Sequence, residues 1–240
     1  MPWRSSIALL ALVASACSSD PRASAQPYAA PPALPPAPAA PSPHPPLLFR
    51  RSVQLTIFGS FPEPALAQVE AQLRSQLDVE VLPARQRELP ASAYYAPRKR
   101  YRAERLLDAL DSQPHRGFGQ LGLTEVDIST TKGKHKDWGV FGLAWIGGDS
   151  AVLSTHRLLR DKPSEELYRF RVVTTAVHEI GHMLGLDHCS EPRCLMNDAE
   201  GSIKTVDESS GELGPRCKAA LTRLAPKRQL PLREREGAAH

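Results

Sequence analysis

The sequence contains no apolar run that approaches the roughly 20 residues a membrane-spanning helix requires. The apolar stretch nearest the start, residues 7–14, follows the basic Arg4 and is less than half that length. A short apolar run behind a basic residue is typical of a secretory signal. We therefore expect an exported protein without a transmembrane helix, which contacts a membrane through a lipid anchor only.

Cysteine is also scarce, with four residues in 240, and the first of them marks the end of the expected signal. The tetrapeptide Ala14-Ser15-Ala16-Cys17 resembles a bacterial lipobox, in which the cysteine becomes the lipidated mature N-terminus, although Leu or Val is more usual where Ala14 stands. We expect residues 1–17 to be a lipoprotein-type signal peptide, which places the protein in the bacterial cell envelope on its periplasmic or surface side. Ordinary secretion and an uncleaved start are the alternatives.

No recognised nucleic-acid-binding motif is present. The net charge of +4 and the pI near 9.0 are mild, and the basic residues gather at positions 98–102 and at Lys132, Lys134 and Lys136. In an exported protein without such a motif, these residues indicate a solvated surface. We expect no nucleic-acid partner.

Proline, in contrast, is abundant, with 23 residues, and it marks the domain boundaries. Residues 18–46 are almost wholly Pro, Ala and Ser, which predicts an extended linker of up to about 90 Å without a core. The linker contains no cysteine, so we do not expect latency through a cysteine ligand from this segment. Residues 47–225 are long enough for one domain with a core, and residues 226–240 form a polar tail.

Apolar periodicity within the domain predicts a mixed, twisted sheet covered by helices, an α/β (α+β) fold. Alternating residues predict strands at 53–57 and 79–81, and the helical spacing between them makes this a β-α-β unit with parallel strands. Further elements are expected as a helix at 103–110 and strands at 120–129, 139–146 and 151–154, the last at a sheet edge. A final helix begins near Ser164 and runs to about Leu184, and its apolar stripe consists of Val173, Val177, Ile180 and Leu184.

The stretch HEIGHMLGLDH near the end of that helix carries the chemistry. His178 and His182 are four residues apart, so on a helix both imidazoles project from one face and can bind one metal ion. Glu179 adjoins the first histidine, where it can deprotonate a water molecule. Gly185 allows the chain to turn and bring in His188 as a third nitrogen ligand. Three protein ligands with one open position indicate a catalytic zinc ion.

This stretch, followed by a methionine, resembles the metzincin clan of zinc peptidases, in which Met196 would be the Met-turn residue beneath the zinc. More narrowly, the flanking Cys189 and Cys194 resemble the archaemetzincins, whose signature continues with a Cys-x-x-Cys pair. Residues 123–128 and 141–158 also resemble the sheet region of that family. The resemblance implies a metzincin-like zincin fold, with a long active-site helix and a smaller C-terminal subdomain, and a zinc peptidase that acts on peptides or proteins.

Two positions depart from the archaemetzincin pattern. Gly214 stands where the pattern places the third cysteine of a second zinc site, while the fourth is present as Cys217. Leu143 occupies a position in the FGxA segment where we expect a carboxylate. The second zinc site is therefore one thiolate short.

The three cysteines of the domain allow several states. Cys189, Cys194 and Cys217 need a fourth ligand, such as a nearby Asp, Glu or water, to hold a structural zinc ion. An exported protein could instead form a disulfide between Cys189 and Cys194 and leave Cys217 free. Three unpaired thiols are the remaining alternative, and the sequence leaves all of them open.

The inferred reaction is hydrolysis of a peptide bond by a zinc-activated water, with Glu179 as the general base. By resemblance, the substrate lies along an edge strand above the zinc, for which residues 151–155 are the candidate. One alternative is a non-catalytic, zinc-containing, peptide-binding lipoprotein, and another is a metal store. The intact Glu179 argues against the peptide-binding protein, which needs no general base there, whereas the altered cysteine site argues mildly in its favour. The metal store predicts exchangeable metal and no dependence on Glu179.

Overall fold

The structure is a computed structural model that describes residues 51–115 and 117–224 of the chain. The expected signal peptide (1–17) with Cys17, the linker (18–46) and the polar tail (226–240) lie outside the described residues. Among the residues described, no helix is both long enough and apolar enough to cross a membrane.

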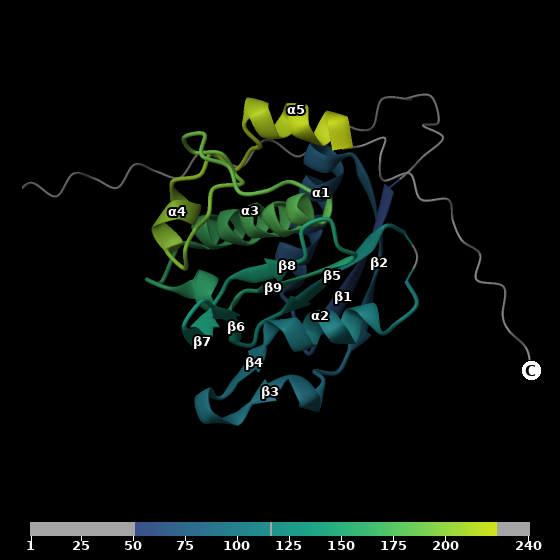
Figure 1. Cartoon of the computed structure of the whole chain (residues 1–240), viewed down its shortest axis with the longest axis vertical. Coiled ribbons are helices and arrows are strands. Elements are labelled where there is room, and N and C mark those ends of the chain that lie inside the picture. Colours follow the sequence, from purple (N-terminus) through teal and green to yellow (C-terminus); the bar gives the residue numbers. More distant parts are fainter. Residues whose placement is uncertain (1–50, 116, 225–240) are drawn as a thin grey trace, which may run out of the picture. The chain divides into compact units, whose positions relative to one another are not determined.

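The larger of two sheets consists of the strands β1 (Arg51–Phe58), β2 (Val79–Arg87), β5 (Gly119–Thr124), β8 (Gly142–Ala144) and β9 (Ser150–Ser154). They lie in the order β2-β1-β5-β9-β8 (Figure 1). The first four in this order are parallel, and β8 runs antiparallel to β9. The predicted β-α-β unit is confirmed, because helix α1 (Glu63–Leu77) connects the parallel neighbours β1 and β2.

The smaller sheet contains β3 (Tyr94–Tyr95), β4 (Arg100–Arg102), β6 (Ile128–Lys132) and β7 (His135–Gly139), in the order β3-β4-β6-β7. The single strands predicted at 120–129 and 139–146 are wrong, since each segment is divided between the two sheets. The first division is held by Asp127, whose carboxylate binds Arg157 (Nε–Oδ1 2.6 Å) and Arg100 (Nε–Oδ2 3.1 Å). These ion pairs fix a corner that separates β5 from β6.

The edge of the larger sheet is not where the sequence pattern placed it. β9, which contains the predicted edge segment, lies between β5 and β8, and all five of its residues are buried. β8 is the edge strand, and its three residues are only half-buried. The proposal that residues 151–155 form the exposed edge is therefore wrong, because a strand paired on both sides has no free backbone groups to offer.

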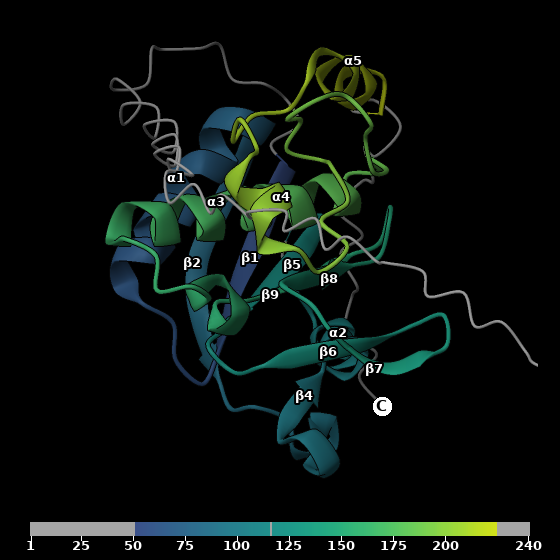
Figure 2. The ribbon, with the colours of Figure 1, turned by 90° about the vertical axis from the view of Figure 1, so that its left-hand side faces the viewer.

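Helices cover both faces of the larger sheet (Figure 2). Helices α1 and α3 (Glu165–Met183) share one core with the inward side chains of the strands, and α2 (Ala103–Asp111) packs with Phe58 and Val152 on the opposite face. Successive strand residues point to opposite faces, so Leu153 enters the first core while its neighbour Val152 enters the second. Burial of each such large apolar side chain contributes about 1.5–3 kcal/mol.

Helix α3 forms as the sequence predicts. Its N-cap is Ser164, whose hydroxyl accepts a hydrogen bond from Leu167 N (3.2 Å), and two glutamates occupy its positive first turn. The predicted apolar stripe (Val173, Val177, Ile180 and Leu184) is buried in the core shared with α1. The remaining helical segments are short: η1 (Ala91–Ala93), η2 (Ala96–Arg98), η3 (His156–Leu159), α4 (Ile203–Asp207) and α5 (Pro215–Leu224).

The segment after α3 forms a smaller C-terminal subdomain that includes α4 and α5. It contacts α3 through a buried ion pair in which Arg171 binds Asp207 twice, at 2.6 Å (Nε–Oδ1) and 2.8 Å (Nη2–Oδ2). The same guanidinium donates to the carbonyls of Leu158 and Arg160. One side chain of the helix therefore joins α4 to the end of η3.

Candidate metal centre

The last two turns of α3 present two histidines to a common point. His178 Nδ1 lies 2.9 Å from the carbonyl oxygen of Leu195, and His182 Nδ1 lies 2.8 Å from that of Leu186. Because a carbonyl only accepts, each Nδ1 carries the proton and each Nε2 presents a lone pair. The two Nε2 atoms face each other at 3.0 Å.

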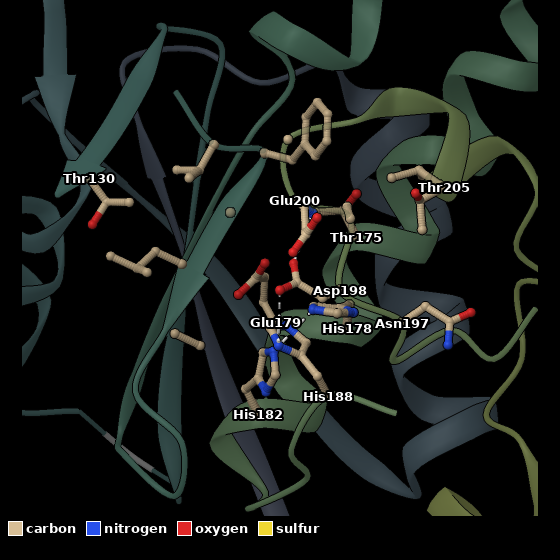
Figure 3. A pocket seen from close by; sticks show the side chains of 18 of the residues that line it. Thr130, Thr175, His178, Glu179, His182, His188, Asn197, Asp198, Glu200 and Thr205 are labelled. Carbon is tan, nitrogen blue, oxygen red and sulfur yellow. Dashed lines mark hydrogen bonds and ion pairs between the residues drawn. The ribbon is translucent and has the colours of Figure 1, made fainter. Parts of the chain in front are cut away.

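The third histidine returns to this point through a turn at Gly185. Gly185 has φ +95°, a left-handed conformation that side chains other than glycine rarely adopt, and its N–H donates to the carbonyl of His182 (2.8 Å). The chain then runs back to His188, an exposed residue whose Nδ1 lies 3.6 Å from Asp198 Oδ2. Donor nitrogens of His178, His182 and His188 lie within 4.8 Å of one another. Figure 3 shows the three rings converging beside Glu179.

The chemistry of these donors fits zinc. Burial, together with the charge of the neighbouring His182, lowers the pKa of His178 to about 3, and burial also lowers the pKa of His182. Both rings are therefore neutral near neutral pH, which is the form that binds a metal ion. Two facing lone pairs repel each other unless a cation lies between them. The hydrogen bonds from Nδ1 fix the ring orientations, as such bonds do in zinc sites generally.

Glu179 faces the same space from the adjacent helix position. Its side chain is only 6% exposed, and burial raises the pKa of its carboxyl to about 8. A neighbouring dication would favour the carboxylate form, since an opposite charge lowers the pKa of an acid. The edge strand β8 passes directly over it, because a Cβ on Gly142 would overlap Glu179 Oε1. Glycine at position 142 is therefore what allows the sheet edge to lie so close to this carboxyl.

Met196 is fully buried against the helix that carries His178 and His182. Its sulfur lies so close to the helix that a Cβ on Gly181 would stand 2.7 Å from Met196 Sδ. The Met196 carbonyl also accepts a hydrogen bond from Cys189 N (2.8 Å), which joins the two segments that follow the helix. The Met-turn role of Met196 stays a prediction, and in the structure its side chain packs against helix α3.

The three cysteines of the domain come together in the C-terminal subdomain. The sulfurs of Cys189, Cys194 and Cys217 lie within 4.8 Å of one another, and the Cys194 and Cys217 sulfurs are 3.7 Å apart. All three are free thiols, so the Cys189–Cys194 disulfide that the sequence allowed is not formed. Burial and the two neighbouring thiols raise the pKa of Cys217. The three converging sulfurs are of the donor type that binds structural zinc and could supply three of its four ligands.

A groove with a cavity of about 490 Å³ runs past the histidines, between β8 and the C-terminal subdomain. Its walls are mainly apolar, including Leu143 and the exposed Trp145 and Ile146 that follow β8. Thr174 and Thr175, one turn before the first histidine, lie at its side. Leu143, which stands where a carboxylate was expected, therefore adds an apolar side chain to the wall of the groove.

Several residues of the groove were missed by the sequence reasoning. Asp198 lies beside His188, and the pKa of its carboxyl is lowered: burial acts in the opposite direction, but the Glu200 N–H and the charges of His188 and Lys132 outweigh it. The feature of the sequence that could have indicated Asp198 was its position two residues after Met196. Trp145 and Ile146 were expected at the end of the strand 139–146 but follow β8 in the structure, and the signal for them was two apolar residues in front of a glycine turn.

A long helix bearing HExxH, with a third histidine after a glycine turn and a buried methionine beneath, defines a zinc-dependent metallopeptidase. The model of the family described as "Peptidase family M54" matches residues 65–223. The chain belongs to this family, the archaemetzincins, whose members are zinc metallopeptidases.

Individual relatives agree with this assignment. The archaemetzincin of Natronomonas pharaonis is 32% identical over 176 residues, which cover 70% of this chain and 98% of the relative. The crystal structure of archaemetzincin from Methanopyrus kandleri matches with a TM-score of 0.66 and 34% identity, covering 74% of this chain and 96% of that one. The archaemetzincin structure from Archaeoglobus fulgidus matches with a TM-score of 0.58 and 34% identity, over 70% of this chain and 98% of that one. The metzincin-like fold expected from the sequence is thereby confirmed.

Proposed function

We propose that this zinc peptidase hydrolyses peptide bonds with His178, His182 and His188 as its catalytic zinc ligands and Glu179 as its general base. The observation that supports this most directly is the position of Glu179, a buried carboxyl beside three converging imidazoles. When bound, zinc supplies Lewis acidity, which polarises the substrate carbonyl and makes a water more acidic.

In this mechanism the side chain of Glu179 transfers the protons. The Glu179 carboxylate accepts a proton from the attacking water and then donates it to the nitrogen of the departing amine. Burial favours the protonated carboxyl midway through this cycle, because it raises the pKa of Glu179.

Substrate would lie extended along β8, the edge strand that replaces the candidate at 151–155. β8 borders the groove, and in the described part of the chain it pairs with β9 alone. An added peptide strand would gain backbone hydrogen bonds there and pass directly over Glu179. The apolar side chains along the groove, among them Leu143, Trp145 and Leu195, favour substrates with apolar residues beside the scissile bond.

The test compares the wild type with Glu179→Gln on a mixed peptide library, with bound zinc measured in both. Gln keeps the shape of the side chain but cannot accept the proton, so we expect unchanged zinc and a turnover lowered by about 10²–10⁴-fold. Full turnover in Glu179→Gln would exclude the general-base role. The cleaved peptides would also report whether apolar residues flank the cut.

We further propose that the chain is exported and anchored by a lipid on Cys17. The support is the apolar stretch 7–14 and the lipobox-like tetrapeptide ending at Cys17, followed by the proline-rich linker 18–46. Cys17→Ser should release the protein from the membrane fraction and abolish lipid labelling. Cys189→Ser, which leaves the tetrapeptide intact, should keep both; equal labelling of the two variants would contradict the anchor.

A further inference from the structure

The three-cysteine cluster described above has three sulfurs for a site that takes four ligands. A structural zinc ion is tetrahedral, and with only three protein ligands its fourth position is open to water or to another side chain. Position 214, where the archaemetzincin pattern places a further cysteine, holds glycine in this chain. The missing ligand must therefore come from elsewhere in the chain or from solvent.

The space next to Gly214 is occupied by a carboxylate. A Cβ on Gly214 would overlap the Oε2 atom of Glu191 and stand 3.3 Å from the sulfur of Cys194. Glu191 thus places an oxygen where a side chain at position 214 would begin, beside one of the three sulfurs. The glycine and the glutamate are complementary, because a larger residue at 214 would displace the carboxylate.

Glu191 is held in this position by its own contacts. Its Oε2 accepts a hydrogen bond from Arg216 N at the start of α5 (3.1 Å) and lies 3.8 Å from Cys189 Sγ. Backbone N–H groups also point at the sulfurs: Glu191 N donates to Cys189 (3.4 Å) and Gly214 N donates to Cys194 (3.2 Å). Such bonds stabilise thiolates and orient metal ligands.

We propose that Glu191 is the fourth ligand of the second zinc ion, which completes a three-thiolate, one-carboxylate site with Cys189, Cys194 and Cys217. Three thiolates and a carboxylate carry the same total charge as four thiolates, so the site with Zn²⁺ bound would have the same net charge as a tetracysteine site. Binding releases the three thiol protons to solvent and involves no oxidation. Glu191 is half-buried, and the 3.8 Å between its Oε2 and Cys189 Sγ is close to the roughly 3.5 Å that separates a sulfur and an oxygen ligand on a tetrahedral zinc ion.

The site would connect three segments that support the catalytic centre. Cys189 directly follows His188, Cys194 precedes Met196 by two residues, and Cys217 lies on α5. A metal ion shared by these segments would fix the loop that carries the third histidine. Its role is structural, so this proposal does not depend on Glu179 acting as a base.

The experiment uses the full chain with Glu179→Gln, which prevents self-cleavage, and cadmium-113 NMR together with metal content. We expect two metal ions per chain and two resonances, one of them at the strongly deshielded position of a thiolate-rich site. Glu191→Ala should weaken the second site by at least tenfold and shift its resonance, while the histidine-site resonance stays in place. Glu212→Gln, which alters an exposed glutamate in the same region, should leave both resonances unchanged.

Rescue makes the assignment specific. The double variant Glu191→Ala/Gly214→Cys should regain tight binding and move the resonance further in the direction of a four-thiolate site. If Glu191→Ala fails to fold, Glu191→His, which retains a zinc-binding side chain, should fold and give a nitrogen-shifted resonance. The proposal is overturned if Glu191→Ala binds two ions with unchanged affinity and resonances, or if the double variant does not recover the lost affinity.

Discussion

The Nε2 atoms of His178 and His182 face each other at 3.0 Å, while each ring donates from Nδ1 to a backbone carbonyl. Neither ring can turn to relieve the opposed lone pairs without losing its carbonyl partner. A cation between them removes the repulsion and adds two bonds, so the folded state gains from metal binding.

We therefore expect zinc removal to destabilise the protein. Dialysis against a chelator should lower the midpoint temperature of thermal unfolding. Zinc at about 100 times its dissociation constant should restore about 2.7 kcal/mol of unfolding free energy per site. Calorimetry with and without zinc measures the change, and magnesium, which prefers oxygen ligands, is the control. An unchanged midpoint after verified zinc loss would contradict the coupling between metal and fold.

Gly142→Ala should lower activity without removing zinc. The new Cβ would overlap Glu179 Oε1, so either the carboxyl or the edge strand must move, and a shift of about 1 Å at a catalytic group can cost about 100-fold. The matched control is Gly133→Asn, since Gly133 has φ +56° in the β6–β7 turn with open space around it, and asparagine tolerates that conformation. Equal activity in both variants would show that the approach of β8 to Glu179 is unimportant.

Trp145→Ala should raise KM for substrates with apolar residues and change kcat less. Trp145 is 46% exposed at the rim of the groove, where it offers apolar surface to a bound peptide. Tyr94 is a suitable control because it is 47% exposed but lies on β3 of the smaller sheet, outside the groove lining. Tyr94→Ala should leave both constants unchanged, and parallel effects in the two variants would rule out a local role for Trp145.

Arg171→Met should cost about 3–5 kcal/mol of unfolding free energy, because it leaves Asp207 buried without its partner. The two side chains are 2% and 6% exposed. Arg171→Met/Asp207→Leu should recover much of the loss, since an apolar pair replaces the buried charges. Lys204→Ala, which breaks an exposed pair on the same helix α4, should cost less than about 0.5 kcal/mol in urea unfolding.

Glu104→Gln should destabilise the protein at neutral pH and much less in acid. Burial alone would raise the pKa of Glu104, but hydrogen bonds from Thr130 (2.6 Å) and Thr131 N (2.9 Å) and the charge of Arg102 lower it below 4.5. A folded pKa below the unfolded pKa stabilises the protein at pH values above the unfolded pKa, and this contribution is lost as the pH falls through the lower, folded pKa. Urea unfolding of the wild type and Glu104→Gln near pH 7 and near pH 3.5 measures this contribution. The same difference in unfolding free energy at both pH values would contradict the lowered pKa of Glu104.

Helix α3 and its two histidines could be predicted because the relevant information is local. The i, i+4 spacing, the Ser164 cap and the apolar stripe all lie within one continuous segment. Gly185 likewise predicted the turn that returns His188. These features are determined by residues that are close together in the sequence, so they do not depend on the arrangement of the rest of the fold.

Strand order could not be predicted in the same way, because it depends on partners distant in sequence. The five residues of β9 are the same in sequence whether the strand lies at the edge or in the middle of the sheet. Its pairing with β8 places it in the middle. The corner at Asp127 depends on Arg157, 30 residues away. For the same reason the meeting of Glu191 with position 214 is visible only once the fold brings them together.

The exposure of His188 has a kinetic consequence. His178 and His182 are fixed on a helix whose opposite side forms the core, whereas His188 is on a surface loop after a glycine turn. Surface loops unfold locally far more often than core helices do. We therefore expect His188 to be the last of the three ligands to bind an arriving ion and the first to dissociate from it. The lifetime of the bound ion would then be governed by this loop, and anything that stiffens the loop would slow metal exchange even where equilibrium affinity hardly changed.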